Sequence, residues 1–144
     1  MATKLFLDTN IILDILDTER SFSKESQLLF KLIEDETLQA YFSESVVTTT
    51  DYVLIKKFSN AKRISILTDL LKLITIIECS NSIIENALVK KETDDVEDAI
   101  LYELALNKKL DYFITNDKQA LKKGATKKLP IITTKDFLIM MNVR

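Results

Sequence analysis

The sequence predicts an α/β fold in which a central, mainly parallel β-sheet is covered by helices on both faces. Short apolar segments of strand length alternate along the chain with longer segments whose apolar residues recur at helical spacing. Strands separated by helices form βαβ units, and these units need a parallel sheet with helices packed against it. The length of 144 residues suits one hydrophobic core, so we expect a single domain over residues 1–144.

The predicted elements alternate from one end of the chain to the other. Strands are expected at Lys4–Leu7, Leu38–Phe42, Leu73–Glu78, Asp111–Thr115 and Pro130–Thr133. Helices are expected over residues 11–16, 23–35, 44–57, 61–72, 81–91, 95–107, 117–123 and 135–141. Gly124 is the expected C-cap of the short helix 117–123.

The residue types that are missing narrow the chemistry. The chain has no histidine, which excludes His-based triads and His zinc sites, and its one glycine excludes a glycine-rich phosphate loop. The single cysteine, Cys79, cannot form an intramolecular disulfide, and no apolar run is long enough to cross a bilayer. We therefore expect a cytoplasmic protein, without a membrane segment, whose chemistry comes from carboxylates, hydroxyls, amides, Lys, Tyr or Cys79.

Three aspartates fall where they could share one pocket. Asp8 follows the first predicted strand, Asp117 follows the strand at 111–115, and Asp98 lies near the start of the helix 95–107. Ligands of parallel sheets bind outside the carboxyl ends of the strands, which is where Asp8 and Asp117 are expected. Carboxylates that meet there repel one another, and Mg²⁺ or Mn²⁺ would relieve the repulsion and could activate a water molecule.

Each acid also has a structural interpretation. Asp8 and Asp117 could cap the helices that follow them, whereas Asp98 lies one turn inside its helix and is a better ligand than a cap. Asp94 and Glu97 have the spacing of an N-cap and N3 capping pair, with Asp95 beside them as a reserve ligand.

Two further acids and a lysine-rich stretch are expected at the surface. Asp14 and Asp17 are interpreted as solvated helix positions. The net charge is −2, yet the stretch from Lys118 to Lys135 carries lysines and no acid. This stretch is either a solvated helix end and loop or a patch that contacts phosphates. Its lysines are Lys118, Lys122, Lys123, Lys127, Lys128 and Lys135.

Three stretches of the sequence resemble the PIN-domain ribonucleases, especially the VapC-like toxins of prokaryotic toxin–antitoxin pairs. They are LDTNIILDIL, VEDAILYELALNKKLDYFITND and PIITTKDFL, and they span nearly the whole chain in the family's order. The resemblance implies a PIN-like three-layer sandwich and an endoribonuclease that depends on Mg²⁺ or Mn²⁺. It also implies an RNA substrate, a cognate antitoxin protein and a homodimer.

The resemblance assigns roles by position. Asp8, Asp98 and Asp117 would be the metal-binding and catalytic acids. The residues that would support them or contact the substrate are Thr9, Asn10, Thr115 and Asn116.

One position departs from the family pattern. A further acid is usual in the helix after the second strand, and counting from Ser43 places it near Thr49, which is not acidic. Asp51 is the best substitute as a fourth catalytic acid, and Glu44 is another. If neither serves, the chain could be a catalytically weakened PIN-fold module that binds RNA or a protein partner.

Two other α/β enzyme classes also carry acids at strand ends, and both fit less well. A receiver-like phosphoacceptor domain needs an acidic pair after the first strand, where this chain has Asp8-Thr9-Asn10. A haloacid-dehalogenase-type phosphatase needs Asp-x-Asp there, and Asn10 stands in the place of its second aspartate.

Overall fold

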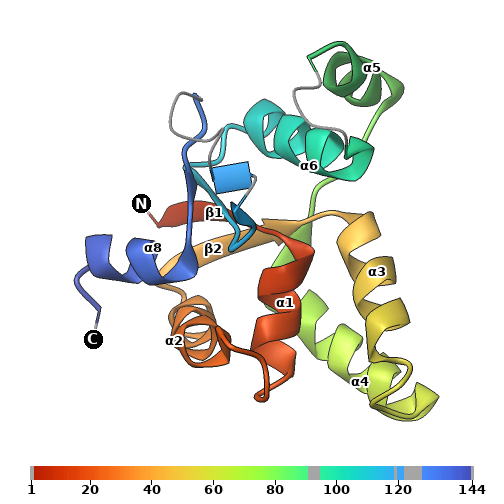
Figure 1. Cartoon of the computed structure of the whole chain (residues 1–144), viewed down its shortest axis with the longest axis vertical. Helices are drawn as coiled ribbons and strands as arrows, with labels where there is room; N and C mark the ends of the chain where they lie inside the picture. The colour runs from red at the N-terminus through yellow and green to blue at the C-terminus, as the bar shows by residue number, and fades with distance from the viewer. Residues whose placement is uncertain (1, 91–94, 119, 122–127, 144) are drawn as a thin grey trace.

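The computed structural model describes residues 2–90, 95–118, 120–121 and 128–143 (Figure 1). Its strands are β1 (Thr3–Leu7), β2 (Leu38–Phe42), β3 (Ile74–Ile76), β4 (Tyr112–Ile114) and β5 (Ile131–Ile132). Its helices are α1 (Thr9–Leu16), α2 (Ser23–Glu34), α3 (Glu44–Leu54), α4 (Asn60–Leu71), α5 (Asn81–Lys90), α6 (Val96–Asn107) and α8 (Thr134–Met140). Of the predicted helix 117–123, residues 118, 120 and 121 are helical, and the Leu121 amide donates to the Asp117 carbonyl at 3.1 Å. Residues 119, 122 and 123 and the predicted cap at Gly124 lie outside the described residues.

The strands form one sheet in the order β3-β2-β1-β4-β5, and every neighbouring pair is parallel. The predicted parallel sheet is therefore confirmed. The strands predicted at 73–78 and 130–133 are shorter than expected, since only Ile74–Ile76 and Ile131–Ile132 pair with a neighbour.

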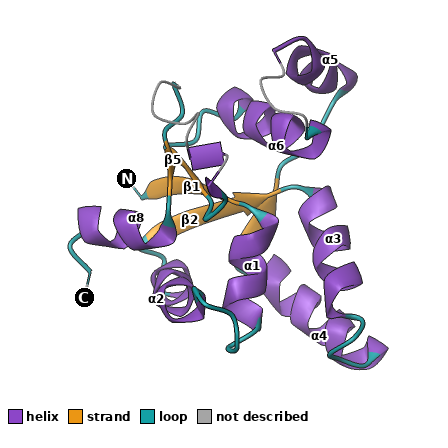
Figure 2. Ribbon diagram, viewed as in Figure 1, coloured by secondary structure: helices purple, strands orange, loops and turns teal. Residues whose placement is uncertain are grey.

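Helices cover both faces of the sheet, as predicted for a three-layer sandwich. Helices α5 and α6 pack together on one side, while α1 and α2 lie on the other side (Figures 1 and 2). Helix α3 contacts both α1 and α4, and α8 contacts α2. No helix in the described part of the chain has the length and apolar character needed to span a membrane.

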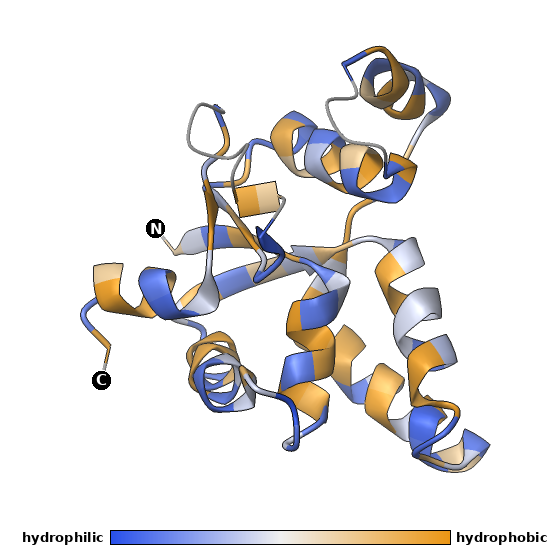
Figure 3. Ribbon diagram, viewed as in Figure 1, coloured by the Kyte–Doolittle hydropathy of each residue, from blue (hydrophilic) through white to orange (hydrophobic). Residues whose placement is uncertain are grey.

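The core lies around β1 in the middle of the sheet. Leu5, Phe6 and Leu7 are fully buried, because a central parallel strand is covered on both faces. The ring of Phe6 stacks on that of Phe113 from β4, with centroids 5.1 Å apart. Helix α1 is buried along most of its length, and its ribbon in Figure 3 is mainly hydrophobic with single hydrophilic positions.

Side chains cap the helices that begin at the carboxyl edge of the sheet. Ser43 accepts a hydrogen bond from the Val46 amide at the start of α3, and Thr133 accepts one from the Asp136 amide at the start of α8. Such caps satisfy amides that have no partner inside the helix. They fix where each helix leaves the sheet, and so fix the residues beside the strand ends.

Candidate active site

The direction in which strands are added reverses between β1 and β4, and we call the region at the carboxyl ends of these two strands the crevice. The chain adds β2 and β3 on one side of β1, then crosses through α5 and α6 to add β4 and β5 on the other side. The connections therefore leave β1 and β4 in opposite directions, and ligands of open parallel sheets bind at such a switch point. Asp8 follows β1 and Thr115 follows β4, so both stand at this crevice.

Asp8 is a buried residue whose carboxylate accepts two hydrogen bonds. Its Oδ1 accepts from the Thr9 amide at 2.6 Å, which makes it the N-cap of α1, and its Oδ2 accepts from the Thr115 hydroxyl at 2.7 Å. Its own amide donates to the Ile114 carbonyl. Burial raises the pKa of Asp8, although these bonds to the carboxylate oppose the rise. The capping role and the place in the crevice are thus compatible.

Thr115 links the two strand ends. Its side chain is fully buried, and its hydroxyl donates to Asp8 while accepting from the Asp117 amide at 3.1 Å. The same hydroxyl therefore orients the Asp8 carboxylate and the backbone that carries Asp117. The negative charge of Asp117 contributes to the raised pKa of Asp8, which places the two acids near one another.

Helix α6 brings further acids to the crevice. Asp95 is its N-cap and accepts from the Asp98 amide at 3.2 Å. The predicted cap at Asp94 is therefore corrected by one residue, and Asp94 itself lies outside the described residues. With Asp95 as the N-cap, Glu97 stands at the second helical position and not at the predicted third. Partial burial and the charges of Asp95 and Asp8 raise the pKa of Glu97.

Asp98 has the largest change of pKa in the site. Its partial burial, followed by the nearby negative charges, raises its pKa to about 7. Loss of solvation and nearby negative charges both disfavour the charged form of a carboxyl group, so both act in the same direction here. The charges that act on it belong to Asp95, Asp8, Asp117 and Glu97, and with Asp98 we call these five residues the acid group.

The donors of the acid group suit a hard divalent cation. Carboxylate oxygens are the ligands that Mg²⁺ and Mn²⁺ prefer, and their mutual repulsion is a cost that a cation would remove. Over the residues that the structure describes, no three acidic side chains are close enough to form a finished cation site. The group thus fits a divalent cation by its chemistry and by the raised pKa values of Asp8, Glu97 and Asp98, with side chains that must draw together to hold it.

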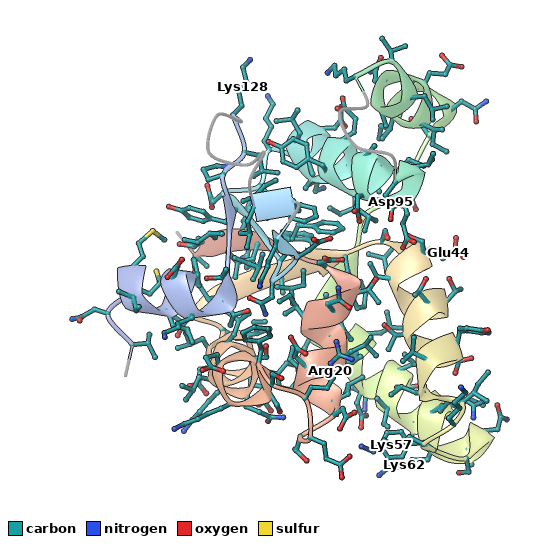
Figure 4. The ribbon with its side chains drawn as sticks, in the orientation of Figure 1. Arg20, Glu44, Lys57, Lys62, Asp95 and Lys128 are labelled. Carbon is teal, nitrogen blue, oxygen red and sulfur yellow. The ribbon has the colours of Figure 1, made fainter. Side chains whose placement is uncertain are left out.

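The candidate fourth acids occupy different places. Asp51 lies in the second half of α3, where its Oδ1 accepts from Arg63 Nε of α4 at 2.8 Å, and it is not among the charges that raise the pKa of Asp8 or Asp98. Glu44 is exposed at the first position of α3, next to the end of β2. Figure 4 shows Glu44 and Asp95 at the starts of α3 and α6. The structure therefore does not bring Asp51 into the acid group.

The expected supporting residues lie around Asp8. Thr9 is buried beside it, and its hydroxyl has no hydrogen-bond partner among the described residues. Asn10 is exposed in the first turn of α1. Asn116, between Thr115 and Asp117, contacts α1 and α8 through its side-chain amide.

Two surface assignments have different outcomes. Asp14 is not a solvated helix position: it is buried, and its carboxylate pairs with Arg20, whose reach back over α1 no local pattern indicated. Asp17 is the C-cap of α1 and pairs with Lys57.

Of the lysine stretch, Lys118, Lys128 and Lys135 are exposed, while Lys122, Lys123 and Lys127 lie outside the described residues.

Comparison with known proteins identifies the family of this chain. A family model described as PIN domain matches residues 4–119. Ribonuclease VapC1 of Aquifex aeolicus is 28% identical over 140 residues, which cover 94% of each chain. The chain therefore belongs to the PIN domain family.

Solved structures share the fold at lower sequence identity. A crystal structure of VapBC2 from Rickettsia felis, bound to a DNA fragment from its promoter, aligns with a TM-score of 0.68 and 16% identity, over 91% of this chain and 98% of the other. The structure of VapC20 from Mycobacterium tuberculosis, a toxin that cleaves the Sarcin-Ricin loop, aligns with a TM-score of 0.61 and 13% identity, over 76% and 86%.

Proposed function

We propose that this protein is a divalent-metal-dependent endoribonuclease, the toxin of a toxin–antitoxin pair. The observation that carries the proposal is the acid group at the switch point between β1 and β4. Its chemistry matches what hydrolysis of a phosphodiester requires, and the similar protein of Aquifex aeolicus is a ribonuclease. The chain lacks histidine, so its own general acid–base chemistry must come from carboxylates or from Lys, Tyr or Cys side chains.

Each residue of the crevice has a part in this proposal. Asp8, Asp98 and Asp117 would hold Mg²⁺ or Mn²⁺, with Asp95 and Glu97 adding negative charge around them. A bound divalent cation lowers the pKa of a coordinated water and stabilises negative charge on a phosphate. The Thr115 hydroxyl keeps the Asp8 carboxylate turned toward the crevice.

The partners follow from the same proposal. The substrate is RNA, and we infer that exposed lysines such as Lys118 and Lys128 contact its phosphates. The fold neighbour from Rickettsia felis is a VapBC2 complex, which supports a cognate antitoxin partner for this chain. Pairing into a homodimer is part of the proposal as well.

Cleavage of a mixed RNA pool by the purified protein tests the activity. The reaction is run with Mn²⁺, Mg²⁺ or EDTA, with wild type, Asp8→Asn and Asp98→Asn. Asp69→Asn is the matched control, since Asp69 is exposed on α4 and pairs with Lys72. The expected result is metal-dependent cleavage by wild type and control that both site variants lose. Equal cleavage by all four proteins would identify a contaminating nuclease and contradict the proposal.

An alternative is a PIN-fold module that binds RNA or a protein partner with weakened catalysis. The observation in its favour is the place of Asp51, which pairs with Arg63 and is not among the charges that act on Asp8 or Asp98. Mn²⁺ titration by calorimetry separates the two functions. An enzyme must bind Mn²⁺ in a manner that Asp8→Asn weakens, whereas a weakened module binds it poorly in both forms.

A further inference from the structure

Asp14 is a buried charge that links α1 to the loop after β4. It is 2% exposed, and a buried carboxylate needs partners that compensate for its lost hydration. Its Oδ1 accepts a hydrogen bond from Arg20 Nε at 2.7 Å, and its Oδ2 accepts one from Asn116 Nδ2 at 3.4 Å. Arg20 lies in the turn between α1 and α2, and its side chain reaches back toward α1 (Figure 4).

Asn116 continues the connection to α8. Its Oδ1 accepts from the Thr134 amide at 3.4 Å, and Thr134 is the first residue of that helix. An amide in the first turn has no acceptor inside the helix, so the Asn116 side chain supplies one. A carboxylate only accepts and an amide N–H only donates, so the two contacts hold the Asn116 side chain in one orientation.

The loop that Asn116 belongs to is the one that carries the site. Thr115 on one side of it bonds to Asp8, and Asp117 on the other side belongs to the acid group. Helix α1 therefore holds this loop at two points, through Asp8 at its start and through Asp14 nearer its end. Fixing the loop at both points limits how far Asp117 can move relative to Asp8.

We propose that Asp14, paired with Arg20, is a positioning residue of the active site that acts through Asn116. It holds the segment Thr115–Asp117 in the place where Asp117 can join Asp8 at one cation. Groups that orient metal ligands in this way commonly change metal affinity about 10- to 100-fold when they are removed. The effect on the cation depends on the proposed function, whereas the link between Asp14 and the loop does not.

Asp14→Asn tests the link in the protein without metal. This variant keeps the size of the side chain and removes its charge, and Asp17→Asn is the matched control because Asp17 is a neighbouring acid of α1 paired with Lys57. Hydrogen exchange of the Asp117 and Thr134 amides is followed by NMR. The expected result is faster exchange at these two amides in Asp14→Asn and no change in Asp17→Asn. Exchange at the wild-type rate would overturn the proposal.

Calorimetric titration with Mn²⁺ tests the consequence. Asp14→Asn is expected to bind Mn²⁺ about 10-fold more weakly than wild type. If Asp14 acts through Asn116, the same substitution has no further effect in an Asn116→Ala background. A general loss of stability would instead weaken binding equally in both backgrounds, and that result would overturn the positioning role.

If Asp14→Asn does not fold, the single variant Asn116→Ala provides the test, because Asn116→Ala leaves the pair of Asp14 and Arg20 in place. It must also weaken Mn²⁺ binding, and a wild-type affinity would contradict the proposal. If wild type itself neither binds Mn²⁺ nor cleaves RNA, the proposed function fails. The exchange of the Asp117 and Thr134 amides then still decides whether Asp14 holds the loop.

Discussion

The Thr115 hydroxyl donates a 2.7 Å hydrogen bond to Asp8 Oδ2, and this bond joins the ends of two adjacent parallel strands. Both groups are buried, and the hydroxyl also accepts from the Asp117 amide. One side chain thus determines the direction of the Asp8 carboxylate and the path of the backbone toward Asp117. Because a hydrogen bond to the charged form lowers a carboxylate pKa, it also keeps Asp8 more ionised than burial alone would allow.

Thr115→Val should therefore weaken metal binding at the site without leaving a cavity in the core. Valine has the shape of threonine but cannot donate to Asp8 or accept from Asp117. We expect Mn²⁺ affinity and RNA cleavage to fall about 10- to 100-fold. Thr115→Ser retains the hydroxyl and should stay close to wild type. Equal losses in both variants would show that packing at this position matters and the hydrogen bond does not.

The raised pKa of Asp98 predicts how stability without metal depends on pH. An unfolded aspartate titrates near 3.8, whereas folded Asp98 titrates at about 7. Between these values the folded state holds a proton that the unfolded state has lost, so unfolding free energy falls as pH rises through this range. Asp8 and Glu97 are shifted in the same direction. In EDTA, the melting temperature should be higher at about pH 5 than at about pH 8.

Asp98→Asn isolates the contribution of this residue. It should melt at a higher temperature than wild type at about pH 8 and at nearly the same temperature at about pH 5. The exposed control Asp69→Asn should keep the wild-type pH dependence. Mn²⁺ should stabilise wild type more than Asp98→Asn at the higher pH. If the melting temperature of Asp98→Asn depended on pH as that of wild type does, the Asp98 carboxylate of wild type would be well solvated.

Much of the fold could be predicted because its signals are local. The buried strand over Leu5–Leu7 and the strand Leu38–Phe42 read directly as apolar segments, and capping residues such as Ser43 mark helix starts. The strand predicted at 73–78 was too long because an apolar run does not show where pairing with a neighbour ends. Pairing is a property of the sheet, and only Ile74–Ile76 has a partner strand.

The candidate site likewise has residues that local signals predict and residues that they do not. Asp8, Asp98 and Asp117 could be proposed because acids at strand and helix ends face one edge of a parallel sheet. The spacing of Asp94 and Glu97 predicts the cap one residue too early, because the adjacent Asp95 carries nearly the same signal. Asp14 is buried and not at the surface, because Arg20 reaches back from the turn after α1 and Asn116 comes from the loop after β4, and no local pattern shows either contact.

Asp51 offers a prediction that separates fold stability from catalysis. Its carboxylate is partly exposed and pairs with Arg63, which also donates to the Phe58 carbonyl. Asp51→Asn should lower the unfolding free energy by about 0.2–1 kcal/mol, the usual range for such a pair. RNA cleavage per folded molecule should not change, because Asp51 lies outside the acid group. Strong loss of cleavage with unchanged urea unfolding would make Asp51 the fourth catalytic acid after all.

Tyr102 fixes α6, which carries Asp98, against the segment before β5. Its hydroxyl donates to the Leu129 carbonyl at 2.7 Å and accepts from the Leu129 amide at 3.2 Å, and Leu129 is buried. Tyr102→Phe keeps the ring contact with Phe113 and removes both bonds. It should lower the unfolding free energy by about 1–3 kcal/mol, because two buried backbone groups lose their partner.

Urea unfolding checks this value, with Tyr41→Phe as the matched control. The Tyr41 hydroxyl makes an exposed 3.4 Å bond to Gln39, so its removal should change the unfolding free energy by less than about 0.5 kcal/mol. If Tyr102→Phe were as stable as Tyr41→Phe, water would be replacing the hydroxyl at Leu129. Tyr102→Phe should also weaken Mn²⁺ binding more than Tyr41→Phe does, because the helix that presents Asp98 loses its anchor to the β5 segment.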